Sequence, residues 1–399
     1  MNKYEKSDRI NTDSYEELSC QRLDDSSFHP INIQNSKSDS KSYASNLQRL
    51  KCFVNEVLLN NEIPFVLRPG TNGEKWYASP SLVGQYFNWM PDFIDVVNRL
   101  PRKYEYSESI NAFITCCHAM GLLSKRLDWK NIWVVDSKKT YPCFGGVSAA
   151  EIFNKLVQAI RNDWNINDRQ AKVNARKEDV ANQKVEYCNY ADSFFKYWAR
   201  LLLVRVDLFY EKQYADSIDV FDMIEDLDRL FGNVRHNSLF DSMIGYIVKL
   251  EYGVEKGIHA HVILFFDGSK RNNFSHIYLA EQIGEYWKCI ITKSLGAYWN
   301  SNATAGHYDE LGRRGIGVIN WNDTDLRSNL REFVVSYLCK EDQYFRPKWG
   351  TKVRLLRRGK FPEIPVNKLG RPRKELESYI GLSQFPPKFM PIKPSDLTS

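Results

Sequence analysis

The sequence predicts an α+β fold in which helices pack on one face of an antiparallel sheet. Residues 200–210 (RLLLVRVDLFY) form a near-continuous aliphatic run, which is typical of a central strand. Residues 245–252 and 258–266 are two more segments rich in β-branched and aromatic side chains. The segment between them begins with Gly253 and ends with Gly257, and glycines suit a tight hairpin turn. A long hairpin beside a central strand is therefore the expected core.

Helical patterns surround these strands. Apolar side chains recur at helical spacing in 216–231, 277–295 and 326–345, and 315–321 (GIGVINW) has the composition of a short strand. The order strand, helix, hairpin, helix, strand, helix predicts a single α+β domain. Before it, 148–199 has the pattern of a long helix or a helix pair.

Changes in composition divide the chain into five predicted regions. The N-terminal segment is polar and poor in aliphatic residues, as disordered segments are. The helical region that follows carries no motif with recognisable chemistry. The expected regions are a disordered segment (1–45), a mainly helical region (46–160), a helical linker (161–190), the α+β domain (191–346) and a basic, largely disordered tail (347–399).

Composition restricts the class of protein. The chain has 22 Tyr, 22 Phe and 10 Trp, enough aromatic side chains for a packed core. Its eight cysteines form no Cys-x-x-Cys pair, which favours a reduced, cytoplasmic protein. No apolar run reaches the length of about 18 residues that spans a membrane, and no N-terminal signal pattern is present. We therefore expect neither secretion nor a membrane partner.

Two histidines in the second hairpin strand form a candidate metal site. His259 and His261 are two residues apart, so both imidazoles leave the same face of the strand, about 7 Å apart along it. Glu251 lies on the partner strand and converges with them if the register allows. Two imidazoles and one carboxylate can bind a divalent cation and leave positions open. The alternative is that these are ordinary hydrogen-bonded polar residues of a sheet.

A tyrosine in the last helical segment is a candidate nucleophile. Tyr337 and Lys340 are three residues apart, on adjacent positions of one helix face. A phenol attacks well only when positive charge stabilises its oxyanion, and Lys340 can supply that charge. Tyr344 lies two turns after Tyr337 and is a secondary candidate. The alternative is a helix whose tyrosine packs on the sheet while the lysine reaches solvent.

Together these motifs resemble those of the HUH endonucleases of rolling-circle replication. The His-x-His strand is followed by a helix with Tyr-x-x-Lys, and "KLEYG…KGIHAHVILFFDGS", "RVDLFY" and "YLCKEDQY" are similar to inovirus-type replication initiators of filamentous phages and prophages. The resemblance covers about residues 190–373. It implies an RRM-related HUH nuclease domain in 191–346 that nicks and joins single-stranded origin DNA in the bacterial cytoplasm.

The resemblance also implies roles for individual residues. His259, His261 and Glu251 would bind Mg²⁺ or Mn²⁺, Tyr337 would be the nucleophile, and Lys340 would assist it. Asp207, in "RVDLFY", is a secondary candidate. The chain departs from the family pattern at Ala260, where a bulkier residue is common, and at Glu341, where two-tyrosine enzymes carry the second tyrosine. These departures indicate a single-tyrosine enzyme.

The C-terminal tail favours a DNA partner. Between Arg346 and Lys374 there are eleven Lys or Arg residues and one acidic residue, Glu363. Such a run neutralises backbone phosphates. The end of this run, LGRPRK, resembles the core of an AT-hook, which lies in a narrow A·T-rich minor groove. A solvated basic linker is the alternative. The candidate DNA-binding residues are Arg354, Arg357, Arg358, Lys360, Arg371, Arg373 and Lys374.

Three functions are compatible with these features. The first is the nicking and joining enzyme, which would need a host helicase because the chain has no P-loop motif, and which would use a host polymerase as a further partner. The second is a non-catalytic DNA-binding accessory or regulatory protein of phage or prophage replication with an HUH-like domain. The third is a metal-dependent hydrolase in which water is the nucleophile.

Overall fold

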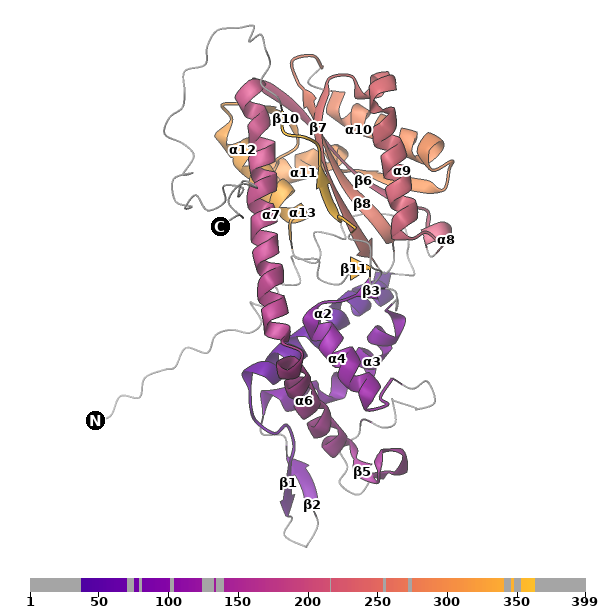
Figure 1. Ribbon diagram of the computed structural model, residues 1–399, viewed down its shortest axis with the longest axis vertical. Coiled ribbons are helices and arrows are strands. Elements are labelled where there is room, and N and C mark those ends of the chain that lie inside the picture. The colour runs from indigo at the N-terminus through magenta and orange to yellow at the C-terminus, as the bar shows by residue number, and fades with distance from the viewer. Residues whose placement is uncertain are drawn as a thin grey trace, which may run out of the picture. The chain divides into compact units, whose positions relative to one another are not determined.

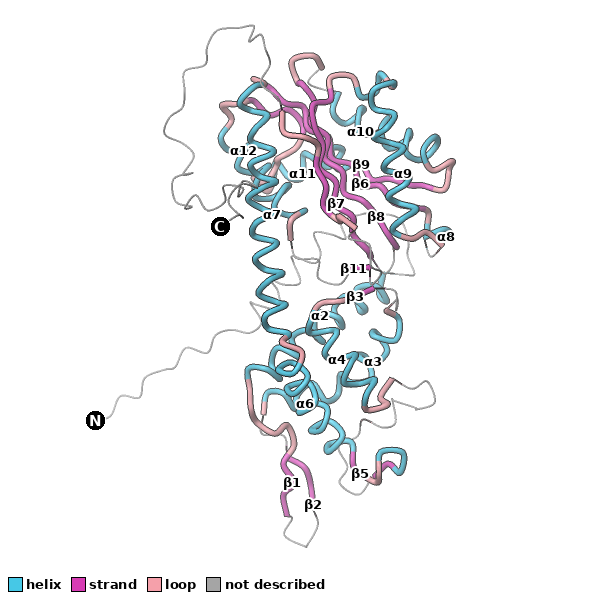
Figure 2. The backbone as a smooth tube through the Cα atoms, viewed as in Figure 1, coloured by secondary structure: helices cyan, strands magenta, loops and turns pink. Residues whose placement is uncertain are grey.

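The computed structural model describes residues 37–69, 75–78, 81–100, 104–123, 133, 140–215, 217–253, 256–271, 275–340, 346–347 and 353–362. These residues form a helical N-terminal region and an α+β domain (Figures 1 and 2). Within the described ranges, none of the helices combines the length and the apolar character needed to cross a membrane.

Four main helices build the described part of the N-terminal region. They are α2 (Lys37–Leu59), α3 (Met90–Arg99), α4 (Glu108–Ala119) and α6 (Ala149–Ile166). The side chain of Ser148 accepts a hydrogen bond from the Glu151 backbone N–H, and Glu151 bonds back to Ser148, so a capping box starts α6. Aromatic side chains fill the core between the helices, namely Phe53, Phe87, Phe93, Phe113 and Phe153. Because α2 begins at Lys37, the expectation that disorder extends to residue 45 is wrong.

Smaller elements complete this region. β1 (Val66–Pro69) and β2 (Lys75–Ala78) form an antiparallel hairpin, and β4 (Thr140–Tyr141) pairs with β5 (Val147–Ser148). The segments η1 (Leu82–Trp89) and η2 (Pro142–Phe144) are 3₁₀ helices. β3 (Tyr104–Glu105) pairs with β11 (Arg346–Pro347).

The helix pair expected in 148–199 is present as α6 and α7 (Arg169–Tyr197). Buried ion pairs fix the start of α7. Arg169 contacts both Glu108 (2.8 Å) and Asp163 (2.5 Å), and Arg176 contacts the other oxygen of Glu108 (2.8 Å). The C-terminal part of α7 is apolar and packs on the sheet of the α+β domain through Tyr190, Phe194 and their neighbours.

A six-stranded antiparallel sheet forms the centre of the α+β domain. Its strands are β6 (Arg200–Tyr210), β7 (Met243–Gly253), β8 (Gly257–Asp267), β9 (Gly296–Asn300), β10 (Gly317–Asn320) and β12 (Leu356–Arg358). The order is β10-β6-β8-β7-β12, and β9 also pairs with β6. The central strand and the hairpin were predicted correctly, which confirms the α+β class.

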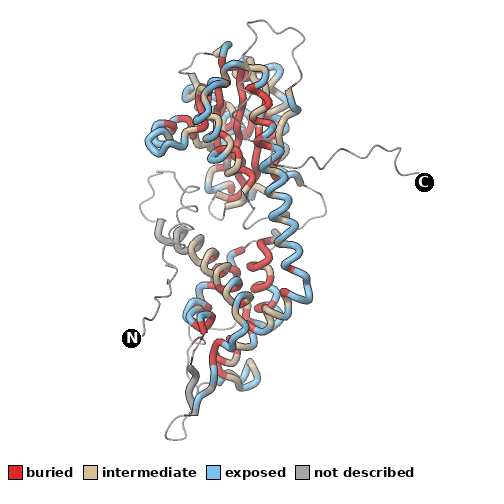
Figure 3. The backbone as a smooth tube through the Cα atoms, turned by 90° about the vertical axis from the view of Figure 1, so that its left-hand side faces the viewer, coloured by how far each residue is buried: buried red, intermediate tan, exposed pale blue. Residues whose placement is uncertain are grey.

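Helices cover both faces of this sheet, not one as predicted (Figure 1). One face packs on α9 (Val220–Gly232) and α10 (Ser275–Tyr286). The other packs on α7 and on a last helix that comprises α12 (Thr324–Asn329), a π-helical turn η7 (Leu330–Val335) and α13 (Ser336–Leu338). The reason lies in β8, which is buried at every residue, so its side chains need partners on both sides (Figure 3).

Short elements connect these larger ones. They are α8 (Lys212–Ala215), η3 (Asn233–His236), η4 (Ser238–Phe240), the π-helical turn η5 (Trp287–Ile291), η6 (Ser301–Thr304) and α11 (Ala305–Glu310). The helix predicted over 277–295 ends earlier, because Gly296 starts β9 and packs against Trp287 and Thr292 with no room for a side chain. The strand β9 was not predicted from the sequence.

Two predicted boundaries near the C-terminus are corrected by the structure. The last helix ends at Leu338 and not near residue 345, so Lys340 follows the helix. The tail expected to be largely disordered from 347 contains β12, which pairs with residues 247–249 of β7. Leu356 of this strand is buried against the sheet, so residues 356–358 belong to the α+β domain.

Candidate active site

Polar side chains from three neighbouring strands meet on one face of the sheet. Each strand contributes two of them, separated by one residue in an otherwise apolar run, so both point to the same face. The register places Asp207 and Lys249 on either side of His261, and Glu251 opposite His259. The six residues are Arg205 and Asp207 on β6, Lys249 and Glu251 on β7, and His259 and His261 on β8.

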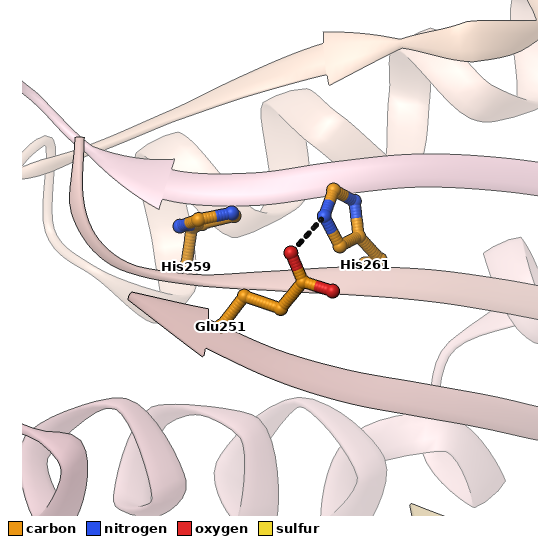
Figure 4. Close-up of side chains that lie close together, drawn as sticks. All are labelled: Glu251, His259 and His261. Atoms are coloured by element: carbon orange, nitrogen blue, oxygen red, sulfur yellow. Dashed lines mark ion pairs between the residues drawn. The ribbon is translucent and has the colours of Figure 1, made fainter. Parts of the chain in front are cut away.

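Glu251, His259 and His261 form the predicted cluster (Figure 4). One ligand atom from each lies within 4.8 Å of the others, which is close enough to surround one cation. Nε2 of His261 lies 3.5 Å from Oε2 of Glu251. The two imidazole rings are 5.2 Å apart and almost perpendicular, at 87°. The hairpin register therefore brings together the three residues that the sequence selected.

The hairpin turn fixes His259. Gly257 has φ of +64°, and a Cβ atom there would lie 3.0 Å from the Ala215 carbonyl oxygen, so glycine suits both the backbone and the space. The Gly257 carbonyl oxygen lies 3.2 Å from Nδ1 of His259. If Nδ1 carries the proton and donates it to this oxygen, the Nε2 atom has a free lone pair that can bind a metal ion.

Burial and neighbouring charges set the protonation of the two histidines. Burial, helped by the charge of His261, lowers the pKa of His259 to about 4, so its imidazole is neutral at pH 7. Burial also acts to lower the pKa of His261, but the carboxylates of Asp207 and Glu251 outweigh it and raise that pKa above its usual value.

Both carboxylates are ionised. Burial would raise the pKa of Glu251, but the charges of His261 and Lys340 outweigh it and hold that pKa well below its usual range. For Asp207, the charges of His261 and Arg205 overcome burial in the same way, and its pKa is strongly lowered. The site therefore contains two anionic carboxylates.

Asp207 lies behind His261, on the side away from Glu251. Its Oδ1 atom is 2.7 Å from Nδ1 of His261 and 3.7 Å from Nε of Arg205. This carboxylate can hold a proton on Nδ1 of His261, which leaves Nε2 directed at Glu251 and available as a ligand. The secondary candidate Asp207 is thus in contact with the site.

The donor set can hold a divalent cation. Oε1 of Glu251 and Nε2 of His261 are buried and make no hydrogen bond of good geometry within the described chain. Such atoms are costly to bury without a partner. A divalent cation between Glu251, His259 and His261 would satisfy them, with a carboxylate and two imidazoles as ligands and further positions open to oxygen.

Tyr337 and Lys340 lie beside this cluster. The Tyr337 ring is 6.1 Å from the His261 ring, centroid to centroid. The Lys340 ammonium lies 3.6 Å from the Tyr337 ring centroid, and its charge also acts on Glu251. The sequence reasoning placed Tyr337 and Lys340 on one helix face; the structure instead brings Lys340 back over the ring from just beyond the helix end.

Sequence reasoning missed Arg205 and Lys249. The Arg205 guanidinium carbon lies 5.3 Å from the Tyr337 ring centroid, and Lys249 is almost fully buried (2% exposed) beside His261. The sequence contains a pattern that could have identified both residues. Arg205 and Asp207 are two residues apart in an apolar strand, as Lys249 and Glu251 are, and this is the same spacing as that of the two histidines.

Asn302 holds the central strand beside Arg205. β10 pairs with residues 200–203 of β6 and β9 with residues 206–210, so neither strand reaches the backbone between them. The buried amide of Asn302 fills this gap, because it accepts from the Arg205 N–H (2.7 Å) and donates to the Leu203 carbonyl oxygen (2.9 Å).

The predicted DNA-binding residues have different environments. Arg357 contacts Asp228 (3.2 Å), and Arg358 contacts Glu186 (2.8 Å) and lies 4.3 Å from the Phe361 ring centroid. These two arginines therefore have partners within the domain. Arg354 and Lys360 are exposed. The other predicted residues, Arg371, Arg373 and Lys374, lie outside the described part of the chain, as does Tyr344.

Comparison with known proteins gives one match. Residues 165–353 match the model of the YagK/YfjJ C-terminal domain, a family found in prophage-like proteins. The match covers α7 and most of the α+β domain, including all the site residues discussed above except those of the tail. No curated protein and no solved structure matches the chain.

Proposed function

We propose that this chain is an HUH-type endonuclease that nicks and rejoins single-stranded DNA as a rolling-circle replication initiator. The observation that carries the proposal is the position of Tyr337 beside His261 of the two-histidine, one-carboxylate cluster, with ring centroids 6.1 Å apart. A nucleophile adjacent to a metal-ligand set is an arrangement that supports phosphodiester transfer. The antiparallel sheet with the cluster on one face is compatible with an HUH, RRM-related domain.

His259, His261 and Glu251 would hold the cation. When bound, Mg²⁺ or Mn²⁺ supplies Lewis-acid polarisation of a phosphate oxygen and offsets charge on the leaving oxygen. His259 suits this role because it is neutral at pH 7, and Glu251 suits it because it is ionised. Asp207 would orient His261.

Tyr337 would act as the nucleophile. Its phenol oxygen forms a bond to phosphorus and loses its proton, while the bond from phosphorus to the 3′-oxygen breaks and that oxygen takes up a proton. The products are a 5′-phosphotyrosyl link and a free 3′-OH. The positive charges of Lys340 and Arg205, which both lie near the Tyr337 ring, stabilise the charge that develops during attack.

The same groups would catalyse the reverse step, in which the strand is rejoined. The phosphotyrosyl ester retains the energy of the original phosphodiester, so a 3′-OH can displace Tyr337 and rejoin a strand without ATP. Because the chain has no P-loop motif, strand separation would come from a host helicase. The free 3′-OH would be extended by a host polymerase. The site of action would be DNA in the bacterial cytoplasm.

A covalent-adduct assay tests this function. The protein is incubated with Mn²⁺ and single-stranded DNA of random sequence that carries a fluorophore at its 3′ end, because the 5′-phosphotyrosyl link retains the 3′ fragment. We expect a labelled band that survives SDS and is abolished by Tyr337→Phe. Tyr278→Phe is the matched control, since this tyrosine is 62% exposed and lies on α10, on the opposite face of the sheet.

The other outcomes identify the competing functions. Cleavage with no adduct would favour a hydrolase that uses water. Binding with no cleavage would favour a non-catalytic accessory or regulatory protein. An adduct that persists in Tyr337→Phe would assign the nucleophile to another residue.

A further inference from the structure

An exposed aromatic side chain lies one turn before Tyr337. The last helix packs on the sheet through Leu330, Val334 and Leu338, which are all buried. Phe333 lies on its outer side and is 44% exposed. Phe333 and Tyr337 are four residues apart, about one turn of the last helix, so they lie close together along it. The core does not use this ring, and exposing it carries a hydrophobic cost.

A cation accompanies this ring. The Arg313 guanidinium carbon lies 5.4 Å from the Phe333 ring centroid. Arg313 is exposed, and no ion pair to a carboxylate is found for it among the described residues. Its neighbour Arg314, in contrast, pairs with Asp309 at 2.5 Å. Arg313 therefore keeps its charge available beside an exposed ring.

The loop that carries Arg313 is fixed to the helix that carries Phe333. The Asn329 side chain donates to the Gly312 carbonyl oxygen (3.1 Å), and Gly312 has φ of +64°. Gly315 packs so closely that a Cβ atom there would lie 2.5 Å from the Leu330 nitrogen. The ring and the guanidinium are thus held together before any ligand arrives.

We propose that Phe333 and Arg313 form a binding subsite for one nucleotide of single-stranded DNA next to the scissile phosphate. The base stacks on the Phe333 ring, and Arg313 contacts the backbone phosphate of that nucleotide. Exposed aromatic rings bind unpaired bases by stacking in this way. The inference rests on the proposed function, because the position beside Tyr337 identifies the ligand as the strand that Tyr337 attacks.

The test separates stacking from phosphate binding. Fluorescein-labelled dT20 and a 20-residue abasic strand, which keeps the phosphates and lacks the bases, are titrated with protein in EDTA and followed by anisotropy. We expect Phe333→Ala to weaken dT20 binding about tenfold and to leave abasic binding unchanged. Phe333→Trp should retain dT20 binding. Arg313→Ala should weaken both strands and reduce the salt slope by about one.

The chain supplies a matched control. Phe221 is exposed to a similar extent (46%) but lies on α9, which packs on the opposite face of the sheet. Phe221→Ala should bind both strands like the unmodified protein. The subsite is refuted if Phe333→Ala and Phe221→Ala bind dT20 equally well, or if Phe333→Ala weakens dT20 and the abasic strand by the same factor.

The result is separable from that of the nuclease assay. Base-dependent binding that requires Phe333, from a protein that forms no adduct, would leave the subsite intact and reject the proposed chemistry. If the Phe333→Ala protein forms the adduct normally and binds dT20 with unchanged affinity, the proposed chemistry is supported and the subsite is rejected.

Discussion

The Nδ1 atom of His261 lies 2.7 Å from the Oδ1 atom of Asp207 on the neighbouring strand. These residues are opposite each other in the register of β6 and β8, so the contact follows from strand pairing. A carboxylate behind a histidine ligand fixes the tautomer of the ring and increases its basicity. The same carboxylate lies near Arg205, which in turn lies near Tyr337. Asp207 thus links the metal-ligand cluster to the surroundings of the proposed nucleophile.

Asp207→Asn should weaken metal binding. Without the carboxylate, His261 loses the group that directs its Nε2 atom toward Glu251, and we expect the Mn²⁺ dissociation constant to rise about 10- to 100-fold. Isothermal titration with Mn²⁺ measures this. Asp325→Asn, an exposed carboxylate near the start of α12, is the control. An unchanged affinity in Asp207→Asn would show that Asp207 does not support the metal site.

Arg205 and Asp207 should be energetically coupled. Both side chains are mostly buried, so removing either takes a charged partner away from a buried charge, at a cost of about 3 kcal/mol. The free energy of unfolding in urea is measured for Arg205→Met, for Asp207→Asn and for the double variant. The double variant should lose less of this free energy than the sum of the losses in the two single variants. In the exposed pair Arg99–Asp95, Arg99→Met should cost less than about 1 kcal/mol. Additive losses at Arg205 and Asp207 would contradict the coupling.

Lys340→Met should slow adduct formation. Its ammonium lies over the Tyr337 ring, and the loss of one stabilising group in a transition state typically lowers the rate about 100-fold. Mn²⁺ affinity should change much less, because Lys340 is not a ligand. Lys270→Met, an exposed lysine that lies 3.9 Å from Asp267, serves as control. A normal rate in Lys340→Met would remove this lysine from the proposed mechanism.

Asn302→Ala should destabilise the sheet. The substitution removes the hydrogen bonds that the Asn302 side chain makes with the Arg205 N–H and the Leu203 carbonyl oxygen, at the junction between β9 and β10. Each unsatisfied group costs about 1–3 kcal/mol. The free energy of unfolding in urea measures the loss, and the exposed Asn322→Ala should be close to neutral. Equal stability of the two variants would mean that another group fills the gap.

Cysteine reactivity should depend on burial. Burial raises the pKa of Cys116 to about 11 and that of Cys339 to about 12, so both remain protonated and unreactive at pH 8. Ellman's reagent should react quickly with the exposed Cys143 and Cys289 and slowly with these two. Mass spectrometry of labelled peptides identifies the sites.

The same pKa shifts make stability depend on pH. In the unfolded chain a cysteine thiol has a pKa near 8.5, which is lower than the raised pKa of the same thiol in the folded protein. As the pH rises, the thiol of the unfolded chain therefore loses its proton first. The free energy of unfolding should therefore be unaffected by these thiols below about pH 8 and decrease above it. Fast labelling of Cys339 at pH 8 without unfolding would contradict its burial.

The strands and the metal-ligand candidates could be predicted from the sequence alone. Aliphatic runs and the two glycines of the turn define β6 and the β7–β8 hairpin, and the spacing of two residues places His259 and His261 on one face. These properties are local, because strand periodicity and turn conformation depend on residues close together in the chain.

Only the tertiary structure decided which residues meet at the site. Arg205, Lys249 and Asp207 reach the histidines through strand register, and Lys340 reaches Tyr337 because the helix ends at Leu338. The second helical layer and the strand β12 also depend on contacts between distant segments, since a strand buried on both faces must find partners wherever the chain supplies them. Packing between remote residues sets these features, and no short stretch of sequence encodes it.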